Sequence, residues 1–129
     1  MSIEVGLAEL AQALAKHPFA YLLTVGDAPR PHVVASSVAV RDGVVTVADA
    51  GRRTRTAIAV NPAVTLLAPP AEPGGYSLIV DGTGVLTDDA VLVTPSRAVL
   101  HRPAPMPTAA PEDGSCGQDC VPIPLEQGN

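Results

Sequence analysis

Short apolar runs that alternate with turn residues are the feature of this sequence that most constrains its fold. Each run ends at a cluster of glycine, proline, aspartate or asparagine, and runs of about four to eight residues are typical of strands. Hydrophobic residues make up 47% of the chain but aromatic residues only 2%, so the core must be built from Val, Leu, Ile and Ala. Because Val and Ile are stiff at χ1 and fit a pleated surface, the sequence predicts a mainly β protein.

The runs predict six or seven short strands and two helices. Ser2 is a suitable N-cap, and apolar residues at helical spacing predict a helix over 3–16 that Pro18 ends. A second helix is expected over 53–60, before Asn61-Pro62. Such a set of elements predicts a small barrel. The expected strands are 20–25, 33–40, 44–47, 63–68, 76–86 with a glycine bulge or bend at 81–84, and 91–100 with Pro95 at an edge or bulge.

Length and charge limit the class of protein. A chain of 129 residues has room for one domain, which we place at 1–102, followed by a Pro-rich acidic tail at 103–129 that we expect to be extended or partly disordered. The net charge of −5 argues against binding to nucleic acid or to a membrane surface. The sequence shows neither an apolar run of membrane-spanning length nor the basic start of a secretory signal, so we expect a cytoplasmic location.

A cluster of basic residues stands at the start of the second expected helix. Gly51 is followed by Arg52, Arg53, Thr54 and Arg55. The first turn of a helix presents unpaired N–H groups, and arginine side chains add charged donors, so one interpretation is a phosphate site. The other is a solvated face that keeps the protein soluble. The arginines by themselves leave both interpretations open.

The order of the segments resembles the pyridoxamine 5′-phosphate oxidase-like split-barrel family of flavin or deazaflavin proteins, in particular its short actinobacterial members. The resemblance runs over about 3–94 and depends on Ala-Tyr-Leu-Leu-Thr-Val-Gly at 20–26, Gly-Asp-x-x-x-Pro-His at 26–32, Gly-Arg-Arg-Thr-Arg at 51–55 and Asn-Pro-Ala-Val-Thr-Leu at 61–66. It implies a six-stranded antiparallel Greek-key split β-barrel with an N-terminal helix and one crossing helix. It also implies a homodimer with two cofactor sites at the interface.

The same resemblance implies which residues hold the cofactor. It assigns the phosphate to Arg53, Thr54 and Arg55, with Arg52 as a further donor. The flavin ring would lie along two strands that include Ser36, Ser37, Val47 and Asp49. His32 could donate to a cofactor carbonyl or protonate a substrate, or it could be an exposed histidine at the start of a strand. The implied cofactor is FMN, with the deazaflavin coenzyme F-420, or no cofactor, as alternatives.

Two departures from the family pattern restrict the function. Thr54 stands where a lysine is common, and the acidic tail replaces an arginine-rich substrate-binding segment. We therefore exclude pyridoxamine phosphate oxidation and expect a flavin- or deazaflavin-dependent oxidoreductase of a small organic substrate. Because the cofactor supplies the chemistry, no catalytic residue is assigned. The alternative is a carrier that binds the cofactor without turnover.

Two cysteines in the tail form a separate candidate site. Cys116 and Cys120 are four positions apart, which suits a reversible disulfide or, together with His101, a metal ion. Two thiols do not by themselves make a metal site, and inert thiols are the alternative. A redox or metal sensor that uses these cysteines is therefore a third, weaker functional hypothesis.

Overall fold

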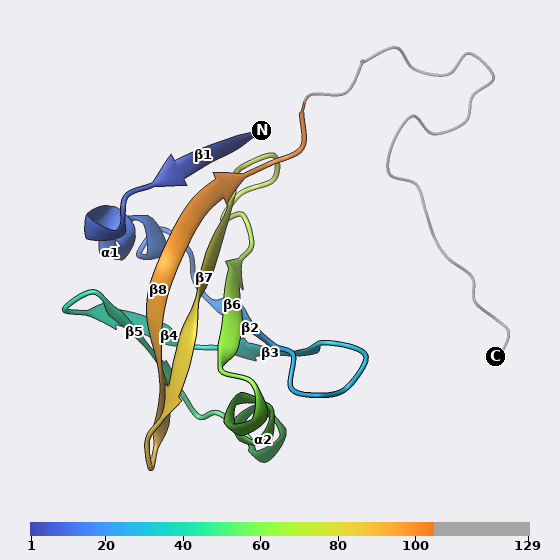
Figure 1. Cartoon of the computed structure of the whole chain (residues 1–129). Helices are drawn as coiled ribbons and strands as arrows, with labels where there is room; N and C mark the ends of the chain where they lie inside the picture. The colour runs from blue at the N-terminus through green and yellow to red at the C-terminus, as the bar shows by residue number, and fades with distance from the viewer. Residues whose placement is uncertain (105–129) are drawn as a thin grey trace, which may run out of the picture.

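Antiparallel strands form one eight-stranded sheet that curls around its own core (Figure 1). The structure is a computed structural model that describes residues 1–104. Two short helical segments lie at opposite ends of the curled sheet (Figure 1). The elements are β1 (Ser2–Val5), η1 (Leu7–Glu9), α1 (Leu10–Leu14), β2 (Ala20–Thr24), β3 (His32–Ser36), β4 (Val38–Arg41), β5 (Val44–Ala48), α2 (Arg52–Val60), β6 (Ala63–Ala68), β7 (Ser77–Leu86) and β8 (Ala90–His101).

The two longest strands, β7 and β8, form the centre of the sheet. The strand order is β3-β2-β6-β7-β8-β5-β4, and β1 also pairs with β8. One edge of β8 is shared, because residues 90–93 pair with β5 and residues 98–101 pair with β1. The mainly β architecture and the split-barrel fold that the sequence predicts are therefore confirmed.

A bend at Ser37 closes the barrel. The sequence predicts one strand over 33–40, but the structure divides it into β3 and β4. β3 pairs with β2 and β4 pairs with β5, so the two halves of this run occupy the two ends of the strand order. The Ser37 carbonyl accepts a hydrogen bond from the Ala48 amide at 3.4 Å. The bend therefore brings β3 and β4, the two ends of the strand order, next to each other.

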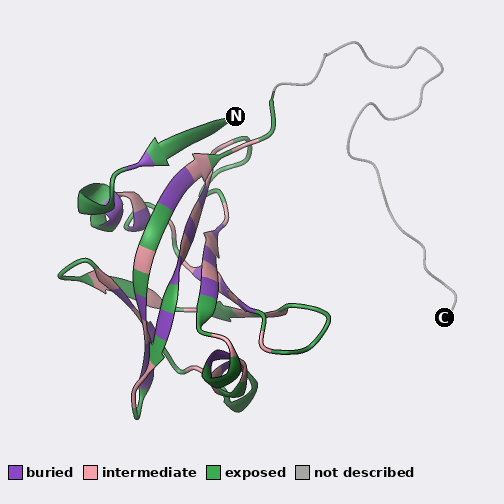
Figure 2. Cartoon of the chain, viewed as in Figure 1, coloured by how far each residue is buried: buried purple, intermediate pink, exposed green. Residues whose placement is uncertain are grey.

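The core consists of aliphatic side chains that alternate along the strands. In β2 and in the first part of β7, buried residues alternate with half-buried ones (Figure 2). Within residues 1–104 no aromatic side chain belongs to the buried core, as the composition predicts. The largest fully buried apolar side chains are Leu10, Leu22, Leu66, Leu78, Val45, Val47, Val80, Val91 and Val93.

The glycine bulge in the expected strand over 76–86 is confirmed. The pairing of β7 with β8 shifts between Asp81 and Gly82, whose partners are Arg97 and Pro95. A Cβ atom at Gly82 would collide with the Thr94 carbonyl oxygen. Only glycine fits this approach, and Pro95 lies at the irregular position, where its missing N–H is tolerated.

The prediction of a helix over 3–16 is wrong for its first turn. The described residues also form eight strands, two more than the six that were predicted. Ser2–Val5 form β1, and the α-helix itself covers only Leu10–Leu14. The backbone of β8 offers a free edge at this point, and Ile3 pairs with Leu100 there. Tertiary pairing thus overrides the local helical spacing. The second additional strand comes from the division at Ser37.

The end of the described chain lies just beyond β8. The predicted tail over 103–129 lies outside the described residues except for Pro103 and Ala104, so the domain boundary stays a prediction. In the part of the chain that the structure describes, no helix has the length and apolar character needed to cross a membrane.

Candidate functional site

The helix α2 starts without a side-chain cap. Its N-cap residue Gly51 has an extended backbone, and the Arg55 amide donates the first intrahelical bond, to the Gly51 carbonyl at 3.0 Å. The preceding N–H groups of the first turn therefore have no acceptor within the helix. Together with the positive end of the helix dipole, they attract an anion. The sequence prediction of a helix over 53–60 is confirmed to within one residue.

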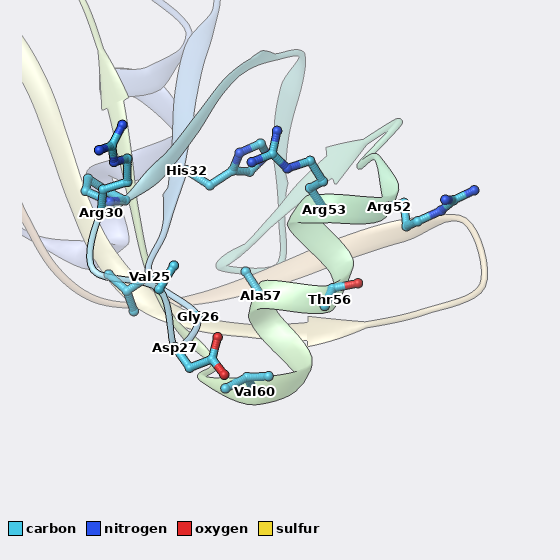
Figure 3. A pocket seen from close by; sticks show the side chains of 12 residues that line it. Val25, Gly26, Asp27, Arg30, His32, Arg52, Arg53, Thr56, Ala57 and Val60 are labelled. Atoms are coloured by element: carbon cyan, nitrogen blue, oxygen red, sulfur yellow. The ribbon is translucent and has the colours of Figure 1, made fainter.

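Two cavities meet at this end of α2. The first has a volume of about 300 Å³ and lies between α2 and the loop that joins β2 to β3 (Figure 3). The second, of about 390 Å³, is lined by Val34 of β3 and by the segment 51–54. His32, Arg52 and Arg53 line both cavities, so these three side chains stand where the cavities adjoin.

The two arginine side chains at this junction have no partner among the described residues 1–104. Figure 3 shows the side chains of His32 and Arg53 at the same end of the first cavity, whereas Arg52 extends outward from the helix. Arg52 and Arg53 are both exposed, and within residues 1–104 neither side chain makes a hydrogen bond or an ion pair. Their donors are therefore available to a ligand.

Thr54 is the one polar side chain of α2 that is fully buried. It is 1% exposed and lines the second cavity, yet its Oγ1 atom has no hydrogen-bond partner among the described residues. A buried hydroxyl without a partner costs about 1–3 kcal/mol. Such a group in a native structure calls for an explanation, and a ligand that accepts a hydrogen bond from it is one.

Arg55 is not brought together with the other two arginines. Its guanidinium donates to the Thr87 carbonyl in the turn between β7 and β8 and, at 3.5 Å, to the carbonyl of Ala90, the first residue of β8. Consecutive helical residues are about 100° apart, so Arg53 and Arg55 project to nearly opposite sides of α2. The two-residue spacing of Arg53 and Arg55 in the sequence already indicates that their side chains lie on different sides of the helix.

The four strand residues that the resemblance assigned to the flavin ring line neither cavity. Ser36 shares a face of β3 with His32 and lies four residues farther along. Ser37 stands at the bend, and Val47 is fully buried in the core. Asp49 is exposed and has a left-handed backbone with φ of 60°. Contacts from these positions to a ligand stay a prediction.

The first cavity also contains residues that the sequence analysis did not select. Val25, Asp27 and Arg30 come from the loop after β2, and Val60 comes from the last turn of α2. The sequence marks 26–32 only as a turn that belongs to the family pattern. Nothing in the local sequence indicates that this turn packs beside α2, because the two segments are some twenty-five residues apart.

The metal hypothesis is not tested by the described residues. Cys116 and Cys120 lie outside them, and His101 Nδ1 lies 3.1 Å from Ser2 Oγ. Within residues 1–104 no three His, Cys, Asp or Glu side chains gather in a way that could hold a metal ion.

Comparison with known proteins gives close relatives of unknown function and more distant ones of known structure. No family model matches the chain. Two uncharacterized proteins, from Mycobacterium bovis and Mycobacterium tuberculosis, are each 44% identical to this chain over an alignment of 136 positions. The alignment covers 92% of this chain and 94% of each relative.

Three solved structures illustrate the likeness of fold. An FAD-binding protein from Mesorhizobium loti has a TM-score of 0.61 at 14% identity and covers 79% of this chain and 99% of its own. A putative pyridoxamine 5′-phosphate oxidase from Listeria innocua has a TM-score of 0.60 at 16% identity, covering 73% and 96%. An F-420 reductase has a TM-score of 0.56 at 19% identity, covering 67% and 94%.

Proposed function

Since the chain belongs to one family with the two mycobacterial proteins and has the pyridoxamine 5′-phosphate oxidase-like split-barrel fold, we propose that it binds a flavin-type cofactor at the start of α2. We propose further that the bound cofactor exchanges a hydride or electrons with a small organic substrate. The names of the neighbours, which include an FAD-binding protein and an F-420 reductase, support a cofactor of this chemical class.

One observation carries the proposal. Three kinds of unsatisfied donor converge on the start of α2: the uncapped backbone N–H groups, the side chains of Arg52 and Arg53, and the buried hydroxyl of Thr54. A phosphate is the group in a flavin cofactor that can accept from all three. Threonine in place of the lysine common in the family keeps a donor but removes a charge, which Arg52 and Arg53 supply.

The protein residues would hold and orient the cofactor. Arg52 and Arg53 would neutralise the phosphate, and Thr54 Oγ1 would donate a hydrogen bond to it. His32 lines both cavities and can donate to the phosphate or to a neighbouring polar group of the ligand. When bound, the cofactor supplies hydride transfer, so the protein needs no nucleophile of its own.

We also propose that a second copy of the chain covers the outer face of the sheet. Tyr21, Leu67 and Ile79 are directly opposite one another across β2, β6 and β7, and these half-buried residues form an apolar row on the face away from the core. The ring of Phe19 extends this row, because it packs edge-to-face on Tyr21 at 5.2 Å. A continuous apolar row of this kind favours association. Native mass measurement of the protein and of Ile79→Lys tests it, and an unchanged monomer for both would contradict it.

The test of cofactor binding is a titration of the full chain. FMN, FAD and coenzyme F-420 are added separately while cofactor fluorescence is followed, and the complex is weighed under native conditions. We expect saturable binding of at least one cofactor. Failure of all three to bind would overturn the proposed function.

Turnover is tested on the protein loaded with whichever cofactor binds. The cofactor is reduced chemically and mixed with a quinone acceptor, and its reoxidation is followed by absorbance. Oxidation faster than that of the free reduced cofactor is expected of an oxidoreductase. Oxidation that is slower than, or equal to, that of the free cofactor would leave only the carrier role.

A further inference from the structure

The junction formed by His32, Arg52 and Arg53 carries positive charge that residues 1–104 do not neutralise. Both arginine side chains are exposed, and neither makes a hydrogen bond or an ion pair within the described part of the chain. The helix start beside them is uncapped, and the buried hydroxyl of Thr54, which lines the second cavity, has no partner among these residues either. The junction can therefore bind a carboxylate as well as a phosphate.

The first cavity begins at this junction and has largely apolar walls. They come from the loop after β2 and from α2, and they include Val25, Pro31, Ala57 and Val60. Val25 is 44% exposed and Val60 55% exposed, although both are large aliphatic residues. Arg52 and Val60 are the first and last residues of α2, so the apolar wall runs about 12 Å from the junction. A ligand that fits both parts has an acceptor group followed by about 12 Å of apolar surface.

The chain beyond the described residues contains a segment of this kind. Residues 105–129 include no Lys, Arg or His, and their acidic residues are Glu112, Asp113, Asp119 and Glu126. Glu126 directly follows the uncharged, apolar run Val-Pro-Ile-Pro-Leu at 121–125. Proline favours an extended backbone that rises about 3.1 Å per residue, so this run would span about 12 Å.

We propose that this C-terminal segment binds the cofactor site of its own chain, with the Glu126 carboxylate at the junction and 121–125 along the first cavity. The carboxylate accepts hydrogen bonds from Arg52 and Arg53, and the aliphatic side chains of 121–125 cover the exposed apolar wall. The segment thus competes with an anionic ligand for the site. This inference concerns the regulation of the site, and it rests on the proposed function in that the competing ligand is the cofactor.

The length of the segment decides which of its acids can reach the junction. The described chain ends beyond β8, at the opposite end of the curled sheet from α2 (Figure 1). β8 has 12 residues, spans about 36 Å, and contacts Arg55 of α2 through its first residue, Ala90. An extended chain covers at most about 3.6 Å per residue. Glu126 lies 22 residues beyond Ala104 and can cover this path, whereas Glu112 lies 8 residues beyond it and cannot.

The direction of the segment follows from the charge at the far end of the cavity. Figure 3 shows the carboxylate of Asp27 beside Val60, at the end away from the junction. With Glu126 at the junction, Asp119 lies beyond the far end of the cavity, where water and salt screen it from Asp27. In the reverse direction, Glu126 would directly adjoin Asp27 and be repelled.

The contact itself is tested by NMR on the cofactor-free full chain. A nitroxide label is placed on Cys120 in a chain that carries Cys116→Ser. We expect the label to broaden the amide signals of Asp27 and Val60 most strongly, because Cys120 adjoins the end of the run that lies there. Inorganic phosphate should reduce this broadening more than sodium chloride of equal ionic strength does. Broadening that is absent, or strongest at the start of α2, would overturn the proposal.

Matched variants in the same assay show whether charge complementarity holds the contact. Glu126→Gln and Glu112→Gln each remove one negative charge from the same segment, and only Glu126→Gln should reduce the broadening, by more than half. The double variant Arg52→Ala and Arg53→Ala should abolish it. An equal effect of Glu112→Gln would mean that only net charge matters, and the assignment of Glu126 would be wrong.

The consequence for binding is measured by fluorescence titration with whichever of FMN, FAD or coenzyme F-420 the native chain binds. A site that is open for about a quarter of the time binds a ligand about fourfold more weakly than one that is always open. We therefore expect Glu126→Gln to bind the cofactor about threefold more tightly than the native chain, and Glu112→Gln to bind it equally. Unchanged affinity in Glu126→Gln would overturn the competition. If no cofactor binds, the proposed function fails, and the label experiment still decides whether the segment occupies the site.

Discussion

The two ends of the barrel both carry arginine, but they differ in whether the protein itself uses it. At the end where the described chain starts and stops, the Met1 amino group donates to the Arg102 carbonyl at 2.9 Å. The Arg102 guanidinium donates to the Gly74 carbonyl at 3.4 Å and lies 4.5 Å from the centre of the Tyr76 ring. At the α2 end, Arg52 and Arg53 have no partner among residues 1–104, and Thr54 Oγ1 is buried without one.

The two ends differ in unused donors, and this difference, not the number of charges, is the ground for proposing the cofactor site at α2. Arg102 ties the end of β8 to the loop before β7, where it serves the fold. The same contrast occurs within α2, where Arg55 holds the turn between β7 and β8 while Arg53 stands free two residues earlier. Each of the following experiments tests this contrast.

The largest expected effect is on binding, from the double variant Arg52→Ala and Arg53→Ala. Each charged hydrogen bond to a phosphate contributes about 1–1.5 kcal/mol at an exposed site, so flavin affinity should fall about thirtyfold or more. The free energy of unfolding should change by less than about 0.5 kcal/mol, because both side chains are exposed. Fluorescence titration and chemical denaturation measure the two quantities.

A double variant of equal charge serves as its control. Arg41 and Arg97 are exposed, lie on β4 and β8, and line neither cavity. Arg41→Ala with Arg97→Ala should leave flavin affinity within about twofold, apart from a weak long-range effect that salt removes. An equal loss of affinity in both double variants would mean that only net charge matters.

Arg55→Ala should act on stability. Its removal leaves the Thr87 carbonyl without this donor, and we expect the free energy of unfolding to fall by about 1–2 kcal/mol. Thermal and chemical denaturation without ligand measure this loss. A variant of unchanged stability that has lost flavin affinity as strongly as Arg53→Ala would show that Arg55 turns toward the phosphate.

Two buried threonines provide a matched pair with smaller effects. Thr24 and Thr54 are 0% and 1% exposed, and neither hydroxyl has a partner in the described part of the chain. Valine has nearly the same shape, so Thr24→Val and Thr54→Val should each raise the free energy of unfolding by about 1 kcal/mol. Only Thr54→Val should weaken flavin binding, by about fivefold. Equal binding by both variants would remove Thr54 from the site.

The smallest effect is expected at the opposite end of the barrel. Ser2→Ala removes the contact of Ser2 Oγ with His101 Nδ1 at 3.1 Å, which is exposed. We expect the free energy of unfolding to change by less than about 0.5 kcal/mol and flavin affinity not to change. A substantial loss of affinity would connect the two ends and contradict their separation.

Much of the fold could be predicted because its signals are local. Alternation along β2 and β7, the turn residues between strands, and the glycines at 81–84 each act within a few positions. Ser2–Val5 could not be assigned in this way, because its choice between helix and strand depends on the free edge of β8. For the same reason the division of 33–40 into two strands follows from pairing at opposite ends of the sheet.

The candidate site could be predicted only in part. The sequence indicates Gly51 through Thr54 as the start of a helix rich in donors, and these residues line the cavities. It does not indicate that Arg55 serves the turn at Thr87, nor that the loop at Asp27 lies beside Val60. These relations join segments that are far apart in the chain, and only the curled sheet brings them into contact.

The sequence by itself thus determined the class of fold and the place of the basic cluster, because strand periodicity, turn chemistry and helix starts depend on neighbouring residues. Tertiary structure decided which of these side-chain donors make hydrogen bonds within the protein and which do not. Arg53, Thr54 and Arg55 are adjacent in sequence. Within residues 1–104, however, Arg53 has no partner, Thr54 is buried without one, and Arg55 is bound to a distant turn. The physical reason is that the sequence determines the angles between the side chains of a helix, whereas the packing of the helix on the sheet determines which of them find partners.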